Sequence, residues 1–136
     1  MSKENRQTIE QIYIEFGEKN FAAVLEIFSK DFEWIAADNS PLSDQSPYLG
    51  SDAIRDIVFA RINAGFENLS IQIDEIFDVG EKVIVLGYYN GKLNGGTDSF
   101  QAQLAHVWTF NENKPAKFQQ YVDTLKLFLE MKKMTG

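Results

Sequence analysis

The sequence predicts a single α+β domain in which a curved antiparallel sheet wraps around about three N-terminal helices. Two observations support this fold class. The first third of the chain places apolar residues at helical spacing, and the segment between residues 66 and 123 alternates apolar and polar residues between turn signals. Helices followed by a run of strands place the helices on one face of an antiparallel sheet. At 136 residues the chain fits one domain, so we expect residues 1–136 to fold as a unit.

Three helices are expected in the N-terminal half, near residues 4–17, 21–28 and 51–63. In the first of them, four residues form one apolar stripe: Ile9, Ile12, Tyr13 and Phe16. Asn20 is a favourable N-cap for the second helix, and Ser51 or Asp52 can cap the third, because their side chains accept hydrogen bonds from free backbone N–H groups. Leu125, Phe128 and Leu129 allow a further helix at the C-terminus.

Strands are expected in two regions. A short strand near residues 32–36 follows from the alternation of polar and apolar residues there, and the turn-rich segment 38–50 after it predicts a loop. Long antiparallel strands are expected from residue 66 onward, because turn signals divide this region at three places: 78–81, 94–96 and 111–114.

The composition excludes several classes of function. The net charge is −7 and no basic stripe is present, so we do not expect a nucleic-acid partner. No apolar run is long enough to cross a bilayer, and no secretory signal is evident, so a cytoplasmic location without membrane contact is the default expectation. With one histidine and no cysteine, the chain lacks the usual ligands for a transition metal, and we expect no metal or cofactor.

The expected strand from about residue 99 to residue 110 carries the only histidine of the chain. Side chains on a strand alternate between two faces, which puts His106 on the same face as a set of apolar residues: Phe100, Ala102, Leu104, Trp108 and Phe110. A histidine in such a position is commonly a hydrogen-bonded core residue. It also suits proton transfer, because its pKa lies near neutrality. Trp108 is expected to form a wall beside it.

Asp123 closes the strand at residues 118–123 and shares a face with Tyr121. Two interpretations of this aspartate remain open. It can cap the C-terminal helix, which spacing alone favours. It can also be a pocket carboxylate whose pKa is raised by desolvation, as a general base requires.

Short motifs along nearly the whole chain resemble one superfamily. They are Tyr13 in the first helix, Asp31-Phe32-Glu33-Trp34, Pro47-Tyr48-Leu49-Gly50, Ala105-His106-Val107-Trp108-Thr109-Phe110 and Tyr121-Val122-Asp123-Thr124. In this order they resemble the nuclear transport factor 2-like superfamily, in particular its SnoaL-like, ketosteroid-isomerase-related branch. The resemblance implies a cone-shaped α+β barrel with a pocket. Members commonly form homodimers through the outer face of the sheet, so it also implies a homodimer.

The resemblance also suggests roles for individual residues. Tyr13 lies near the tyrosine that binds the oxyanion in ketosteroid isomerases, and His106 falls where those enzymes keep a protonated aspartate. Their general base should follow Trp34, where this chain has residues 35–37 without a carboxylate, which argues against steroid isomerisation. Asp123 matches the acid/base aspartate of SnoaL-type polyketide cyclases, which favours a place for it in the pocket.

Three functions are consistent with these residues. The first is a cofactor-independent enzyme of isomerase, cyclase or hydrolase type that acts on a small apolar carbonyl-bearing molecule. Asp123 would be its base, with His106 and Tyr13 as hydrogen-bond donors. Four further side chains would shape its ligand cavity: Trp34, Phe59, Trp108 and Tyr121. The second is a non-catalytic binder of a hydrophobic metabolite, and the third is a dimeric scaffold module that uses the outer sheet face.

Overall fold

The computed structural model describes residues 2–135 and the side chains of residues 4–133. The elements follow one another as α1 (Ser2–Gly17), α2 (Phe21–Ile27), β1 (Glu33–Ile35), β2 (Tyr48–Leu49), α3 (Gly50–Ala53), η1 (Ile54–Phe59), α4 (Ala60–Gly65), β3 (Phe66–Val79), β4 (Lys82–Leu93), β5 (Ser99–Asn111), β6 (Lys114–Val122) and α5 (Thr124–Thr135). The segments α3, η1 and α4 form one continuous helical run. No helix within residues 2–135 has the length and apolarity needed to cross a membrane.

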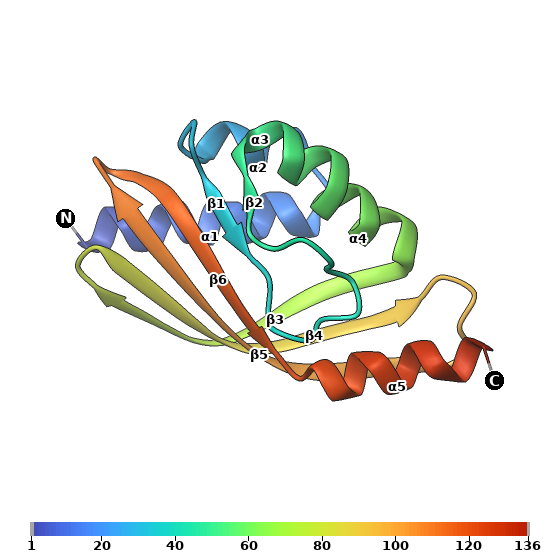
Figure 1. The fold of residues 1–136 in the computed structure, drawn as a ribbon. Coiled ribbons are helices and arrows are strands. Elements are labelled where there is room, and N and C mark those ends of the chain that lie inside the picture. Colours follow the sequence, from blue (N-terminus) through green and yellow to red (C-terminus); the bar gives the residue numbers. More distant parts are fainter. Residues whose placement is uncertain (1, 136) are drawn as a thin grey trace.

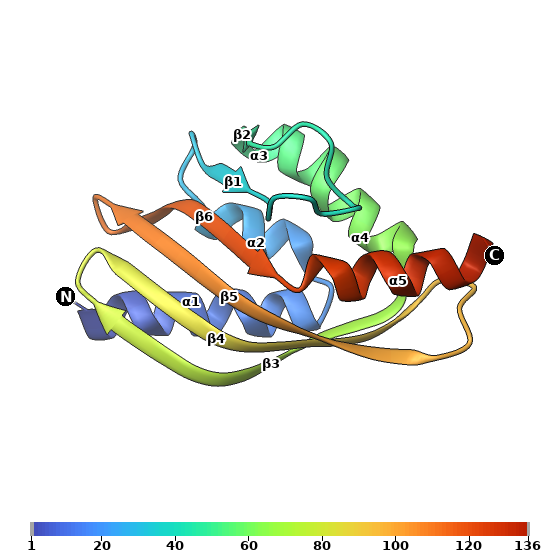
Figure 2. The same ribbon diagram turned by 60° about the horizontal axis from the view of Figure 1, so that its bottom comes forward.

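The strands form one six-stranded, curved and unclosed sheet in the order β2-β1-β6-β5-β4-β3. Figures 1 and 2 show α1, α2 and the α3–α4 run gathered on one side of this sheet, whereas α5 continues from β6 toward the end of the molecule where α4 ends. The expected α+β fold, with helices first and long strands from residue 66 onward, is confirmed.

One part of the expected sheet differs. β1 pairs with β6 in parallel, through Trp34 opposite Phe118, whereas the remaining strand pairs are antiparallel. Only directly connected strands are forced to be antiparallel by a tight turn. β1 reaches the sheet from α2 and lies beside the last strand of the chain, so no hairpin fixes its direction.

The expected helix caps are confirmed only in part: Asn20 is the N-cap residue of α2, but its side chain makes no capping hydrogen bond, and the expected cap of the third helix is wrong. The side-chain amide of Asn20 donates to Glu15 at 3.2 Å and does not cap α2, although the Asn20 carbonyl accepts the N–H of Val24 at 3.3 Å. The third helix begins at Gly50, before Ser51 and Asp52, and no side chain caps it. A cap is less needed there, because the Gly50 N–H is already bonded to the carbonyl of Phe32 at 2.9 Å.

The sheet bends where β3 and β4 shift register between Ile73 and Glu75. Gly87 lies opposite this shift, and a Cβ atom at position 87 would overlap the backbone carbonyl of Gln72. Glycine is required there because the two backbones approach more closely than a side chain permits. The bend curves the sheet around the helices and leaves space between the two layers.

Candidate functional site

A cavity of about 60 Å³ lies between α1, the α3–α4 run and the concave face of the sheet. Aromatic side chains make up much of its wall: Phe16, Phe28, Trp34, Phe59, Phe100 and Trp108. Among the residues of the described chain that line it, none carries an Asp, Glu, Lys or Arg side chain. This volume holds about four water molecules, so a ligand that fits without movement of the walls is small.

The polar side chains of the cavity come from four different elements. Tyr13 lies on the inward face of α1, Tyr89 comes from β4, His106 from β5 and Gln120 from β6. Strand pairing places Gln120 directly opposite His106. Because side chains on a strand alternate, the inward face of β5 presents both His106 and Trp108 to the cavity.

A chain of hydrogen bonds joins these side chains. The Tyr13 hydroxyl lies 2.6 Å from His106 Nδ1, and the Tyr89 hydroxyl lies 2.7 Å from His106 Nε2. Each tyrosine oxygen also accepts a hydrogen bond from another side chain. Trp108 Nε1 donates to the Tyr13 oxygen at 3.0 Å, and Gln120 Nε2 donates to the Tyr89 oxygen at 2.8 Å. The polar side chains of the cavity are therefore held in place by hydrogen bonds to one another.

Burial keeps this network uncharged at neutral pH. His106 is 2% exposed, and desolvation lowers its pKa from 6.5 to about 3. Desolvation likewise raises the pKa values of Tyr13 and Tyr89 above their usual value, although the hydrogen bonds from Trp108 and Gln120 oppose the shift. The histidine is thus a neutral imidazole, and both tyrosines keep their protons.

The π-helical segment η1 shapes the wall of the cavity from the helix side. Its wider turn allows Ile54, Val58 and Phe59 all to be buried. The Phe59 ring meets Trp34 edge-on at a centroid distance of 5.6 Å and stacks on Phe21 at 4.9 Å. Phe59 therefore joins the helical layer to β1 beside the cavity.

A second cavity of about 60 Å³ adjoins the first and shares Trp34 and Gln120 with it. The second cavity is more polar, and its wall includes Ser40, Ser43 and Arg61. It lies beside the loop of residues 36–47, which connects β1 to β2. The loop is tied to the histidine network, because the Ala37 N–H donates to Gln120 Oε1 at 3.2 Å.

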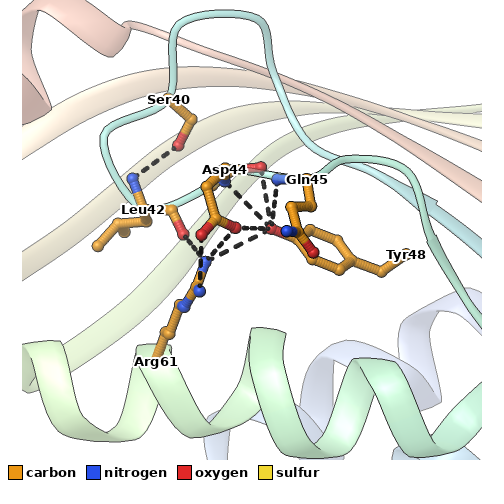
Figure 3. A network of polar contacts seen from close by, with 7 residues as sticks. Ser40, Leu42, Asp44, Gln45, Tyr48 and Arg61 are labelled. Atoms are coloured by element: carbon orange, nitrogen blue, oxygen red, sulfur yellow. Dashed lines mark hydrogen bonds and ion pairs between the residues drawn. The ribbon is translucent and has the colours of Figure 1, made fainter.

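An ion pair holds this loop against α4 (Figure 3). The Arg61 guanidinium donates to both carboxylate oxygens of Asp44, at 2.9 and 3.1 Å, and to the carbonyl of Leu42 at 3.3 Å. The Tyr48 hydroxyl donates to Asp44 Oδ1 at 3.2 Å. Arg61 also lowers the pKa of the Asp44 carboxyl, chiefly through these hydrogen bonds.

Residues 9–117 match the family described as the SnoaL-like domain. The chain belongs to the SnoaL-like family. A search of curated proteins finds no match to it.

Similar solved structures share the fold over almost their whole length. An NTF2-like protein of unknown function from Burkholderia pseudomallei K96243 is 23% identical, with a TM-score of 0.85, and 93% of this chain covers 96% of that one. An NTF2-like protein from Burkholderia thailandensis E264 is 27% identical, with a TM-score of 0.82 and coverages of 92% and 95%. TerC, co-crystallised with polyporic acid, is 20% identical, with a TM-score of 0.83 and coverages of 95% and 98%.

In this SnoaL-like domain the cavity wall contains most of the residues singled out from the sequence: Tyr13, Trp34, Phe59, His106 and Trp108. His106 is hydrogen-bonded in the core, as one interpretation expects, and it also lines the cavity, whereas proton transfer by this residue stays a prediction. The roles of these five cavity residues in binding or chemistry remain predictions.

The expected place of Asp123 in the pocket is wrong. Asp123 is exposed, and its Oδ1 accepts the backbone N–H of Lys126 at 3.0 Å, so it caps α5. Tyr121 is 55% exposed and does not line the cavity either. The physical reason is the facing of β6, on which Phe118 and Gln120 point inward, so that Tyr121 and Asp123 point away.

Sequence reasoning missed Tyr89 and Gln120, which complete the network. A signal for Tyr89 was present, since it shares its strand face with the buried Val83 and Val85. Gln120 was harder to identify, because its neighbour Gln119 is the same residue type. The two faces of β6 therefore do not differ in polarity at this point of the sequence.

Proposed function

We propose that this SnoaL-like domain binds a small, uncharged and largely apolar molecule that carries a carbonyl group. The observation that carries the proposal is a cavity with aromatic walls and one polar end made of neutral side chains. An ion in such a cavity would lose its hydration without gaining a counter-charge, which is costly. A carbonyl oxygen would instead accept a hydrogen bond from a tyrosine hydroxyl. The co-crystal of TerC with polyporic acid supports the idea that this fold can house a small organic compound.

Ligands of equal size and different charge test the proposal. Trp34 and Trp108 both line the cavity, so their fluorescence is a probe of occupancy. Cyclopentanone is expected to change this fluorescence in a saturable way at neutral pH, and cyclopentylammonium to bind at least about tenfold more weakly because its charge must be desolvated. Tyr121→Phe, outside the cavity, is the matched control for the double variant Tyr13→Phe/Tyr89→Phe, which removes both hydroxyl donors of the cavity, and only the double variant should weaken ketone binding. Equal binding of the two probes, or none of the ketone, would contradict the proposal.

A proton-transfer enzyme is the second candidate. It is favoured by the short contact of 2.6 Å between the Tyr13 hydroxyl and His106 Nδ1, which suits a general acid. Binding is the better supported function, because Asp123 caps α5 and no carboxylate is found among the described residues of the cavity wall.

Hydrogen exchange of the ketone distinguishes the two candidates. An enzyme of this type would speed deuterium incorporation at the carbon next to the carbonyl of cyclopentanone in D₂O, and Tyr13→Phe would abolish the acceleration. For a binder we expect no acceleration by the unmodified protein, measured by proton NMR.

A further inference from the structure

The hydrogen-bond directions at both ends of the histidine network are fixed. Trp108 Nε1 can only donate, so the Tyr13 oxygen is its acceptor. The Gln120 amide is oriented by the Ala37 N–H, which must be bonded to an oxygen, so that the Gln120 NH₂ group faces Tyr89. Each tyrosine oxygen therefore already accepts one hydrogen bond from outside the Tyr13–His106–Tyr89 array.

A neutral imidazole has one N–H donor and one acceptor nitrogen. His106 must therefore donate to one tyrosine and accept from the other. With the proton on Nδ1, His106 donates to the Tyr13 oxygen and accepts the Tyr89 O–H at Nε2. The Tyr13 oxygen then accepts two hydrogen bonds, from His106 and Trp108, and its own O–H proton has no partner in the array. With the proton on Nε2, His106 donates to the Tyr89 oxygen and accepts the Tyr13 O–H at Nδ1. The Tyr89 oxygen then accepts two hydrogen bonds, from His106 and Gln120, and its own O–H proton has no partner in the array.

We propose that the His106 tautomer determines which tyrosine donates to the ligand, so that the cavity offers one O–H donor at one tyrosine and one oxygen acceptor at the other. Both tyrosines line the same cavity. The complementary ligand is a neutral hydroxyketone, whose carbonyl accepts from one tyrosine while its hydroxyl donates to the other. Such a ligand can bind in either direction, and the tautomer follows its orientation. This ligand class rests on the proposed binding function, whereas the tautomer switch rests on the protein alone.

Protonation of His106 would remove this selection, because an imidazolium donates at both nitrogens and leaves both tyrosine O–H groups unused. Burial of the ring and its lowered pKa keep the neutral form at physiological pH. His106 is thus a positioning residue, which acts on the ligand through the two tyrosines.

Nitrogen-15 NMR of labelled histidine tests the switch directly, since His106 is the only histidine of the chain. In Tyr13→Phe, the proton should be on Nε2, because it can donate to Tyr89 there, and a buried N–H without an acceptor costs more than an unused acceptor nitrogen. In Tyr89→Phe, the same reasoning places the proton on Nδ1. Opposite tautomers in the two variants, with Tyr121→Phe unchanged from the unmodified protein, support the switch. The same tautomer in both variants, or an imidazolium at neutral pH, overturns it.

Binding to the unmodified protein tests the ligand class and does not depend on how well the variants fold. Three probes share one ring: methylenecyclopentane, cyclopentanone and 3-hydroxycyclopentanone. Each added hydrogen bond is expected to tighten binding by about fivefold. If cyclopentanone binds and the hydroxyl adds nothing, the hydroxyketone class is wrong while the proposed function stands. If no probe binds and the two variants still show opposite tautomers, the proposed function and the ligand class fail while the switch stands.

Discussion

His106 lies in contact with side chains from the helical layer and from the two neighbouring strands, β4 and β6. Its ring is parallel to Tyr13 at a centroid distance of 5.8 Å and meets Phe118 edge-on at 4.7 Å. These contacts replace water around both nitrogens, and the two tyrosine hydroxyls supply the lost hydrogen bonds. The network supplies a hydrogen-bond partner to each nitrogen of the neutral ring but no negative charge to balance a protonated ring. Burial in the folded state therefore lowers the pKa of His106.

This resistance predicts a specific loss of stability in mild acid. The pKa of His106 is about 3 in the folded state and about 6.5 in the unfolded state. Between these values the unfolded state binds a proton that the folded state does not, so stability is full above about pH 6.5 and falls as the pH drops toward 3. Between about pH 7 and about pH 5 the unmodified protein should lose about 2 kcal/mol more unfolding free energy than His106→Gln. Urea unfolding at both pH values measures this difference.

Between about pH 7 and about pH 5, the effect of His106 on stability is separated from that of the ion-paired carboxylates. Ion pairs lower the pKa values of Asp44, Asp56 and Glu130, so the stability that they contribute is lost as the pH falls from the ordinary carboxyl pKa toward the lower pKa of the folded state. Parallel pH dependence in the unmodified protein and in His106→Gln would show that the histidine is protonated in the folded state.

At the scale of elements, the sequence predicted the individual helices and long strands but not the pairing of strands that lie far apart in the chain. Helical spacing and turn signals are properties of short segments, which is why the helices and long strands could be predicted. The parallel pairing of Trp34 with Phe118 joins segments far apart in the chain, and no local pattern encodes it. The same limit explains the candidate site. The alternation around His106 identified its face, whereas on β6 the resemblance favoured Asp123 for the pocket and the inward residue is Gln120.

The loop of residues 36–47 lines the second cavity, and the ion pair between Arg61 and Asp44 ties this loop to α4. Arg61→Gln should leave the fold intact and make the amides of residues 42–48 exchange faster with deuterium, because the guanidinium also holds the Leu42 carbonyl. Mass spectrometry of peptides from this segment measures the change. Arg55→Gln is the matched control, since Arg55 pairs with Asp52 and Asp56 on its own helical run and does not contact the loop. Equal exchange in both variants would mean that the loop is held by other contacts.

On the scale of the whole molecule, the outer face of the sheet and α5 expose apolar surface that the fold does not cover. Leu125, Phe128 and Leu129 recur at helical spacing on α5 and are 63%, 51% and 46% exposed, and Tyr121 on the adjoining strand is 55% exposed. The outward face of β5 presents a semi-polar set of side chains: Gln101, Gln103, Ala105, Val107 and Thr109. Scattered apolar residues are normal on a surface, whereas a contiguous patch beside a broad sheet face is typical of an interface.

We therefore predict a two-fold symmetric homodimer through the outer sheet face, with α5 at its edge. Light scattering at micromolar concentration should give twice the chain mass of 15.5 kDa. Phe128→Glu should shift the mass toward that of the monomer, because a carboxylate at the interface would have to be desolvated against apolar neighbours. Ile14→Glu is the control, since Ile14 is 54% exposed on α1, on the other side of the sheet, and should leave the dimer intact. A monomer mass for the unmodified protein would contradict the dimer. A dimer that persists in Phe128→Glu would mean that α5 lies outside the interface.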